Sequence, residues 1–111
     1  MSRPRMPQTP TYLLAEELAK EKASALGRMG RALEAALAAL AAFDADHPAE
    51  ALSSEQRHSR TTLVGAASVA LWHFIVQREA CGLRDSRQLM RDYRVPLEVQ
   101  YRMGISRNGR K

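Results

Sequence analysis

A chain of 111 residues is long enough for one domain with a modest core, and its single cysteine excludes an intrachain disulfide. The composition is rich in alanine and poor in glycine and proline, which favours helices. The net charge of +5 would suit a nucleic-acid partner, but Arg3 and Arg5 give residues 1–11 a charge of +2, and residues 104–111 carry +3. The residues between are neutral, which argues against a basic DNA-binding face.

Residues 1–11 are predicted to form a flexible basic arm, because three prolines fix φ and remove amide donors there. No apolar run ending in a cleavage site follows the basic start, so the arm is not predicted to be a signal peptide. We therefore expect a cytoplasmic protein whose folded domain begins at Tyr12.

A long helix is predicted from Tyr12 to Phe43, where a seam of residues recurs at strides of three and four. At about 1.5 Å per residue it would be roughly 48 Å long, more than a compact partner from the same chain could cover. Gly27 and Gly30 mark either tolerated weak points or a close helix crossing. The seam consists of Tyr12, Ala15, Ala19, Lys22, Leu26, Met29, Leu33, Ala36, Leu40 and Phe43.

A second long helix is predicted from about Ser54 to Cys81. The segment DADHPAEALSS ends the first helix through its aspartates and proline, and the following SSEQ, residues 53–56, has the pattern of a capping box. Gly82 is the expected end of the second helix. Near this end a capping and salt-bridge cluster that orients the C-terminal helices is predicted for Arg78, Glu79, Arg84 and Asp85.

Two short helices are predicted in the C-terminal part, over residues 85–93 and 97–103, separated by Pro96. Gly104 is expected to end the last one, which leaves residues 104–111 as a basic tail. The sequence thus predicts one all-α domain over residues 12–103, in which two long antiparallel helices and a C-terminal pair of short helices form a bundle.

Residues 61–76, TTLVGAASVALWHFIV, carry no charged side chain and are apolar nearly all round a helix. At about 24 Å this stretch is too short to span a membrane core of about 30 Å, so we expect it inside protein. A homodimer is the simplest source of enough covering helices, and a monomer with its C-terminal helices folded back is the alternative. The predicted dimer core comprises Val64, Ala67, Leu71, Trp72 and Phe74.

His73 and Cys81 are the residues that most invite a chemical interpretation. They are eight positions apart, or about 12 Å on a helix, which is too far for a hydrogen bond. No paired-cysteine or HExxH pattern suggests a metal. We interpret them as a core histidine and a buried thiol, and expect no enzyme activity, no cofactor and no metal.

The segment from Gln88 to Met103 permits a DNA-binding interpretation, because two short helices joined by YRVP have the outline of a helix-turn-helix. Met90 and Arg94 stand where a small residue and a turn glycine are usual, so nucleic acid is not the favoured partner. Its phosphate contacts would be Arg87, Arg91, Arg94 and Arg102. The favoured alternative is a hairpin that packs on the bundle through Leu89, Met90, Tyr93, Val95, Val99 and Met103.

Three stretches, EKASALGRMGRALEAAL, ALWHFIVQREACGLRD and MRDYRVPLEVQYRMG, resemble a family of short uncharacterised bacterial proteins. The resemblance covers most of residues 15–104 and implies a small all-helical protein, with no activity or catalytic residue attached. The sequence therefore favours a homo-oligomeric structural or protein-interaction module, whose partner could also be another, unidentified protein. The alternative is a DNA-binding regulator that uses residues 85–103.

Overall fold

The computed structural model describes residues 8–108, which form helices joined by short turns and no strand. This confirms the predicted all-α fold of two long helices and a C-terminal pair of short ones. The elements are α1 (Gln8–Asp46), the 3₁₀ turn η1 (Ala49–Ala51), α2 (Ser54–Ala80), α3 (Ser86–Asp92) and α4 (Leu97–Asn108).

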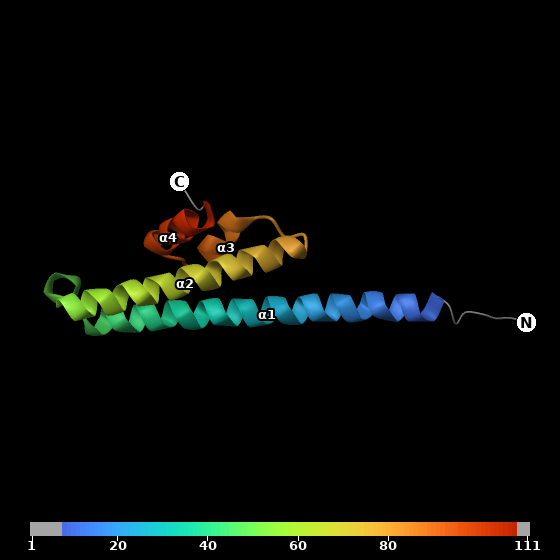
Figure 1. Ribbon diagram of the computed structural model, residues 1–111, viewed down its shortest axis with the longest axis horizontal. Coiled ribbons are helices and arrows are strands. Elements are labelled where there is room, and N and C mark those ends of the chain that lie inside the picture. The colour runs from blue at the N-terminus through green and yellow to red at the C-terminus, as the bar shows by residue number, and fades with distance from the viewer. Residues whose placement is uncertain (1–7, 109–111) are drawn as a thin grey trace, which may run out of the picture.

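The helices form three layers, with α2 in the middle (Figure 1). α1 and α2 run antiparallel along one another, and α3 and α4 lie on the side of α2 away from α1. α1 has 39 residues against 27 in α2, so its N-terminal part extends beyond the end of α2. In this layering the C-terminal helices are folded back on α2, which is the packing that the monomeric alternative requires.

The contact between α1 and α2 uses the second half of the predicted seam. Leu33 and Leu40 are buried, and Leu26, Met29 and Ala36 are packed against the same core. Every residue from Thr11 to Ser24 is exposed, so the first four positions of the seam have no partner in the described chain. The seam packs on the core from Leu26 to Leu40, whereas Phe43 stacks on His47 and the positions before Leu26 are exposed in the single chain.

The contact between α2 and α4 buries a second face of α2. Val99 and Met103 of α4 are buried in the same core as Val64 and Leu71 of α2. The buried Ser68 hydroxyl donates to the carbonyl oxygens of Val64 at 2.9 Å and, across the interface, of Val99 at 3.3 Å. A small hydroxyl side chain with accepting partners can be buried at little cost at this crossing.

The hairpin predicted to pack on the bundle is also confirmed. Four of its six residues are buried and the other two are packed against the core. Tyr93 meets the ring of Phe74 edge-on, with ring centroids 5.4 Å apart, so the turn between α3 and α4 is anchored to α2. The buried residues are Leu89, Val95, Val99 and Met103, and the partly buried ones are Met90 and Tyr93.

The ends of α2 match the sequence signals. Gln56 N–H donates to the Ser53 hydroxyl at 3.1 Å, and Ser53 N–H donates to the Gln56 side chain at 2.9 Å, which completes the capping box. At the other end Gly82 has φ +86°, and the N–H of Leu83 donates to the carbonyl of Arg78 at 2.8 Å. The glycine is needed there because side chains rarely adopt a positive φ.

Three helix boundaries differ from the prediction by three or more residues, and one of them is the end of α1, which lies at Asp46 rather than Phe43. α1 begins at Gln8 rather than Tyr12, because Pro10 falls in the first turn, where amide groups have no helical acceptor to lose. α4 continues through Gly104 to Asn108, because glycine weakens a helix by only about 1 kcal/mol and ends one only where φ turns positive. Residues 1–7 of the predicted arm and 109–111 of the predicted tail lie outside the described residues.

No helix within residues 8–108 combines the length and apolar character needed to cross a membrane.

Gly30 marks a close helix crossing, whereas Gly27 does not. A Cβ built on Gly30 would lie 3.1 Å from the Tyr93 hydroxyl oxygen and 3.2 Å from Cζ of Phe74. A Cβ on Gly27 would meet only the guanidinium of Arg31, at 3.3 Å, which is the end of a flexible chain. The crossing at Gly30 thus joins α1 to α2 and to the α3–α4 turn.

These glycines provide a matched pair of variants. Gly27→Ala is expected to raise the free energy of unfolding by up to about 1 kcal/mol, because alanine is the better helix former. In Gly30→Ala the same gain is opposed by displacement of two rings, so this variant should be at least about 1 kcal/mol less stable than Gly27→Ala. Urea unfolding followed by circular dichroism measures both. Equal gains in the two variants would show that no close crossing exists at Gly30.

Candidate interaction surfaces

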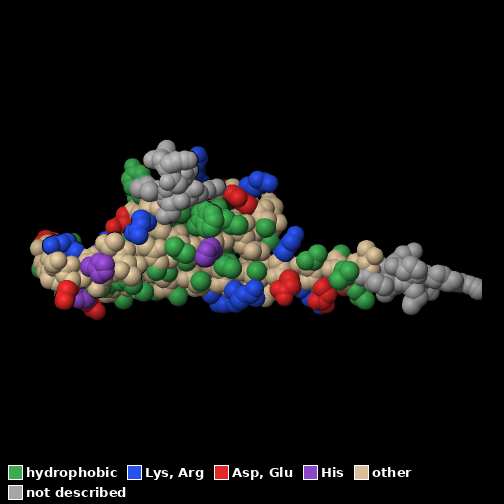
Figure 2. All heavy atoms as spheres, in the orientation of Figure 1, with side chains coloured by type: hydrophobic (Ala, Val, Ile, Leu, Met, Phe, Trp, Pro, Cys, Tyr) green, Lys and Arg blue, Asp and Glu red, His purple; other side chains and the backbone are tan. Residues whose placement is uncertain are grey.

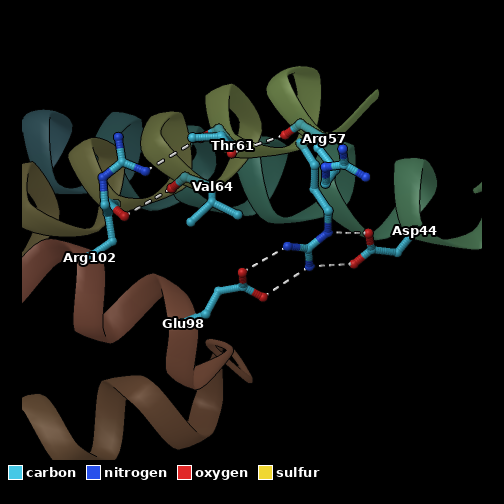
Figure 3. Close-up of polar contacts among 8 residues, drawn as sticks. Asp44, Arg57, Thr61, Val64, Glu98 and Arg102 are labelled. Carbon is cyan, nitrogen blue, oxygen red and sulfur yellow. Dashed lines mark hydrogen bonds and ion pairs between the residues drawn. The ribbon is translucent and has the colours of Figure 1, made fainter. Parts of the chain in front are cut away.

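Arg60 joins three helices because it binds the carboxylates of Asp44 and Glu98, both labelled in Figure 3. Its Nε and Nη2 donate to the Asp44 carboxylate of α1 at 2.7 and 3.0 Å. Nη1 and Nη2 donate to the Glu98 carboxylate of α4 at 2.7 and 2.9 Å. The guanidinium fork therefore binds both carboxylates bidentately and fixes the end of α1 against the starts of α2 and α4.

The pKa values of this cluster follow from the same contacts. Hydrogen bonds from Arg60 lower the pKa of Asp44 and of Glu98 below their ordinary values of 3.8 and 4.5. The two carboxylates in turn raise the pKa of the Arg60 guanidinium. All three groups stay ionised near neutral pH, so neither carboxyl is suited to donate a proton as a general acid.

An open groove of about 440 Å³ lies beside this cluster. Leu37 and Leu40 of α1 line its apolar part, and Arg60 and Arg94 line its charged part. Its charged groups include the two carboxylates already bound to Arg60, so the groove does not bring together a nucleophile and a base.

The four arginines proposed as nucleic-acid contacts are all exposed, but they belong to different elements of the structure. Arg87 and Arg91 belong to α3, and Arg94 lies in the turn with φ +52°. Arg102 instead lies against α2, where its Nη1 donates to the carbonyl oxygen of Thr61 at 3.5 Å. The left-handed backbone of Arg94 is the conformation that a turn glycine would supply.

The residues predicted as dimer core differ in their burial within the single chain. Val64, Ala67, Leu71 and Phe74 are at most 5% exposed in the single chain, whereas Trp72 is 39% exposed. Within the single chain residues 61–76 are not enclosed on all sides, because Val69 and Val76 are 54% and 45% exposed, so the rest of the expected cover would have to come from another chain. The homodimer itself stays a prediction, and the surfaces open to a second copy are others than the four buried residues.

The largest unpartnered apolar surface is at the N-terminal part of α1. We call residues 11–24 the α1 projection, since every one of them is exposed. The contacts Arg60–Asp44 and Phe74–Gly30 set the antiparallel register of α1 and α2, in which the last residue of α2 falls near Ser24. The exposed large side chains of the α1 projection are Tyr12 (64%), Leu13 (51%), Leu14 (66%) and Leu18 (59%).

His73 and Cys81 do not form a site. His73 is exposed beside Trp72, so its interpretation as a core histidine is wrong. Cys81 is partly buried and caps the end of α2. Within residues whose side chains are described, no three His, Cys, Asp or Glu side chains lie close enough to hold a metal ion.

Sequence reasoning missed Arg60 because its partners are 16 and 38 residues away, and no local spacing predicts such contacts. It also read Arg78, Glu79, Arg84 and Asp85 as a capping and salt-bridge cluster. The capping is confirmed, because Asp85 accepts the N–H of Gln88 at 3.1 Å. The salt bridges are not found, since among the described residues the ion pairs are those of Arg60.

Comparisons with known proteins give one match. The sequence model of a family of unknown function (DUF6665) matches residues 2–111. No curated protein and no solved structure matches this chain.

The Arg60 cluster should make stability depend on pH. Both carboxyls have a lower pKa in the folded chain, so the unfolded chain binds more protons once the pH falls below their ordinary values of 4.5 and 3.8. Stabilisation by the cluster is therefore complete above these values and is lost as the pH falls through them. Because these groups are partly exposed, Arg60→Met should cost about 1 kcal/mol at neutral pH.

Urea unfolding at a series of pH values measures this effect. Arg60→Met should lose less stability than the wild type between neutral and acidic pH, and Arg57→Met serves as a control that removes a neighbouring exposed arginine. Identical pH profiles for wild type and Arg60→Met would contradict the assignment.

Proposed function

The chain belongs to the family of unknown function DUF6665, so we propose its role from its own surfaces: it acts as a homo-oligomeric structural or protein-interaction module. The observation that carries the proposal is the α1 projection, whose exposed large apolar side chains have no partner in the described chain. Leu14 and Leu18 are four residues apart and so lie on one face of the helix, each more than half exposed.

A second copy of the chain is the partner that suits this surface. The two-fold pairing of identical helices uses the same patch on both subunits, and antiparallel α1 projections would extend the layer that α2 begins. The projection is the exposed end of the 39-residue α1, so it lacks the tertiary packing that supplies most helical stability in proteins. Packing against a second projection would bury its leucines and stabilise its helix.

The outer stripe of α2, formed by Val69, Trp72 and Val76, is the other apolar surface that supports association. It is smaller, because its residues lie between the two faces already covered by α1 and α4. Tryptophan is a common anchor of protein interfaces, so this stripe is the second candidate for the contact between subunits.

A DNA-binding regulator is the second candidate. The observation that favours it is the positive φ of Arg94, which gives the α3–α4 turn the backbone that helix-turn-helix proteins obtain from glycine. α4 is poorly suited to recognise DNA bases, because Leu97 and Tyr101 are 76% and 75% exposed where a recognition helix would carry polar side chains. Selection of bound DNA from a pool of random duplexes tests this candidate function, because a sequence-specific regulator would enrich one sequence from the pool.

The oligomer is tested by sedimentation equilibrium over a range of concentrations. The wild type should approach twice the chain mass of 12.4 kDa, and Leu14→Glu/Leu18→Glu should remain at one chain while still unfolding cooperatively in urea, because both leucines are exposed in the single chain. The reason is that these charges would be buried at the interface but exposed in the monomer. Leu97→Glu, which alters an equally exposed leucine on α4, is the control and should not change the mass.

A wild-type mass of one chain at all concentrations would contradict homo-oligomerisation. A double variant that still associates would move the interface away from the α1 projection, and loss of association in Trp72→Glu would then assign it to the outer stripe of α2.

A further inference from the structure

The positive charge of this protein is concentrated at its C-terminal end. Residues 84–111 contain eight basic and three acidic side chains, a net charge of +5, whereas residues 1–83 contain nine of each and are neutral. The fold gathers most of the C-terminal residues into the outer layer of α3 and α4 (Figure 1). The predicted domain, residues 12–103, is neutral as a whole because its bounds separate α3 and α4 from the basic residues that follow them. The asymmetry in charge is therefore visible only when the C-terminal residues are counted together.

Four arginines lie on or beside α3: Arg87 and Arg91 are within it, Arg84 precedes its N-cap residue, and Arg94 lies in the left-handed turn that follows. We call Arg84, Arg87, Arg91 and Arg94 the arginine stripe; all four are exposed, at intervals of three, four and three residues. Arg87 and Arg91 share one face of α3, while Leu89 on the opposite side is buried in the core. Figure 2 shows basic side chains along the outer edge of this layer, with an acidic one beside them.

The stripe is not neutralised within the described part of the chain. Neither Asp85 nor Asp92 forms an ion pair there, and Asp85 instead accepts the N–H of Gln88. Glu98 is bound to Arg60. Arg87 and Arg91 are like charges four residues apart on α3 and repel one another, and Arg84 and Arg94 add positive charge beyond its two ends, which favours binding of a polyanion.

We propose that the arginine stripe binds the phosphate backbone of duplex DNA without reading its sequence. The guanidinium fork matches phosphate oxygens bidentately. The seven residues of α3 span about 10 Å at about 1.5 Å per residue, which covers about three phosphates because one strand carries a charge about every 3.4 Å. Contacts to phosphates fix position but carry no sequence information.

An acidic protein is the less suitable partner. Protein interfaces depend on a few buried aromatic or apolar anchors. The arginine stripe offers none, since the large apolar residues of α3 face the core. A group of like charges is complementary to a regular polyanion. This proposal is independent of the oligomer proposed for the α1 projection.

The test is the fluorescence anisotropy of a labelled duplex of arbitrary sequence, titrated with the full chain at several salt concentrations. With three to four phosphate contacts, the logarithm of the association constant should fall with the logarithm of salt at a slope of about −3. Arg87→Ala/Arg91→Ala should bind at least about tenfold more weakly at low salt, and its slope should be smaller in magnitude by about 2. A duplex of unrelated sequence should bind equally well.

The control is Arg28→Ala/Arg31→Ala, which removes two exposed arginines from α1 and should leave binding unchanged. The proposal is overturned if the wild type does not bind at low salt, or if the control weakens binding as much as the stripe variant. It is also overturned if Arg107→Ala/Arg110→Ala/Lys111→Ala abolishes binding while the stripe variant retains it. Preference for one duplex sequence, or equal displacement of DNA by polyglutamate, would likewise contradict it.

Discussion

The structure depends on α2 having two apolar faces that are covered by the same chain. One face packs on α1 through residues such as Ala67 and Phe74, and the other packs on α4 through Val64 and Ser68. Burial of these faces is the main favourable term, because apolar area removed from water contributes roughly 25 cal/mol per Å². Without α2 in the middle, α1 and the α3–α4 hairpin would share few contacts of their own.

This arrangement also determines which surfaces remain for partners. α1 is longer than α2, so the α1 projection has no helix beside it. α2 is covered on two faces only, so the stripe around Trp72 stays open. The α3–α4 hairpin packs inward through its apolar residues and carries its arginines outward. The association proposed for the α1 projection and the polyanion binding proposed for α3 would therefore use different surfaces and different chemistry of one small scaffold.

Local signals in the sequence predicted the local structure well. The capping box at Ser53, the positive φ at Gly82 and the cap at Asp85 all act within a few residues, and each is present. The packing of Leu89 and Val99 was also predictable, because a short amphipathic hairpin next to an apolar helix has one favourable way to bury its residues.

Features that depend on distant residues were not predictable. The ion pairs of Arg60 join positions far apart in the chain. His73 lies in an apolar run, yet it is exposed because α1 and α4 cover the other two sides of α2. The arginine stripe was partly recognised, but Arg84 was assigned to salt bridges that need a tertiary neighbour to form.

Hydrogen–deuterium exchange resolved by peptide tests the central position of α2 most directly. If α2 is covered on two faces by its own chain, amides of residues 64–75 should exchange only through global unfolding and more slowly than those of any other helix. Protection in α1 should then be high where it faces α2 and lower along the α1 projection at low protein concentration. Faster exchange in residues 64–75 than in α1 would contradict the account.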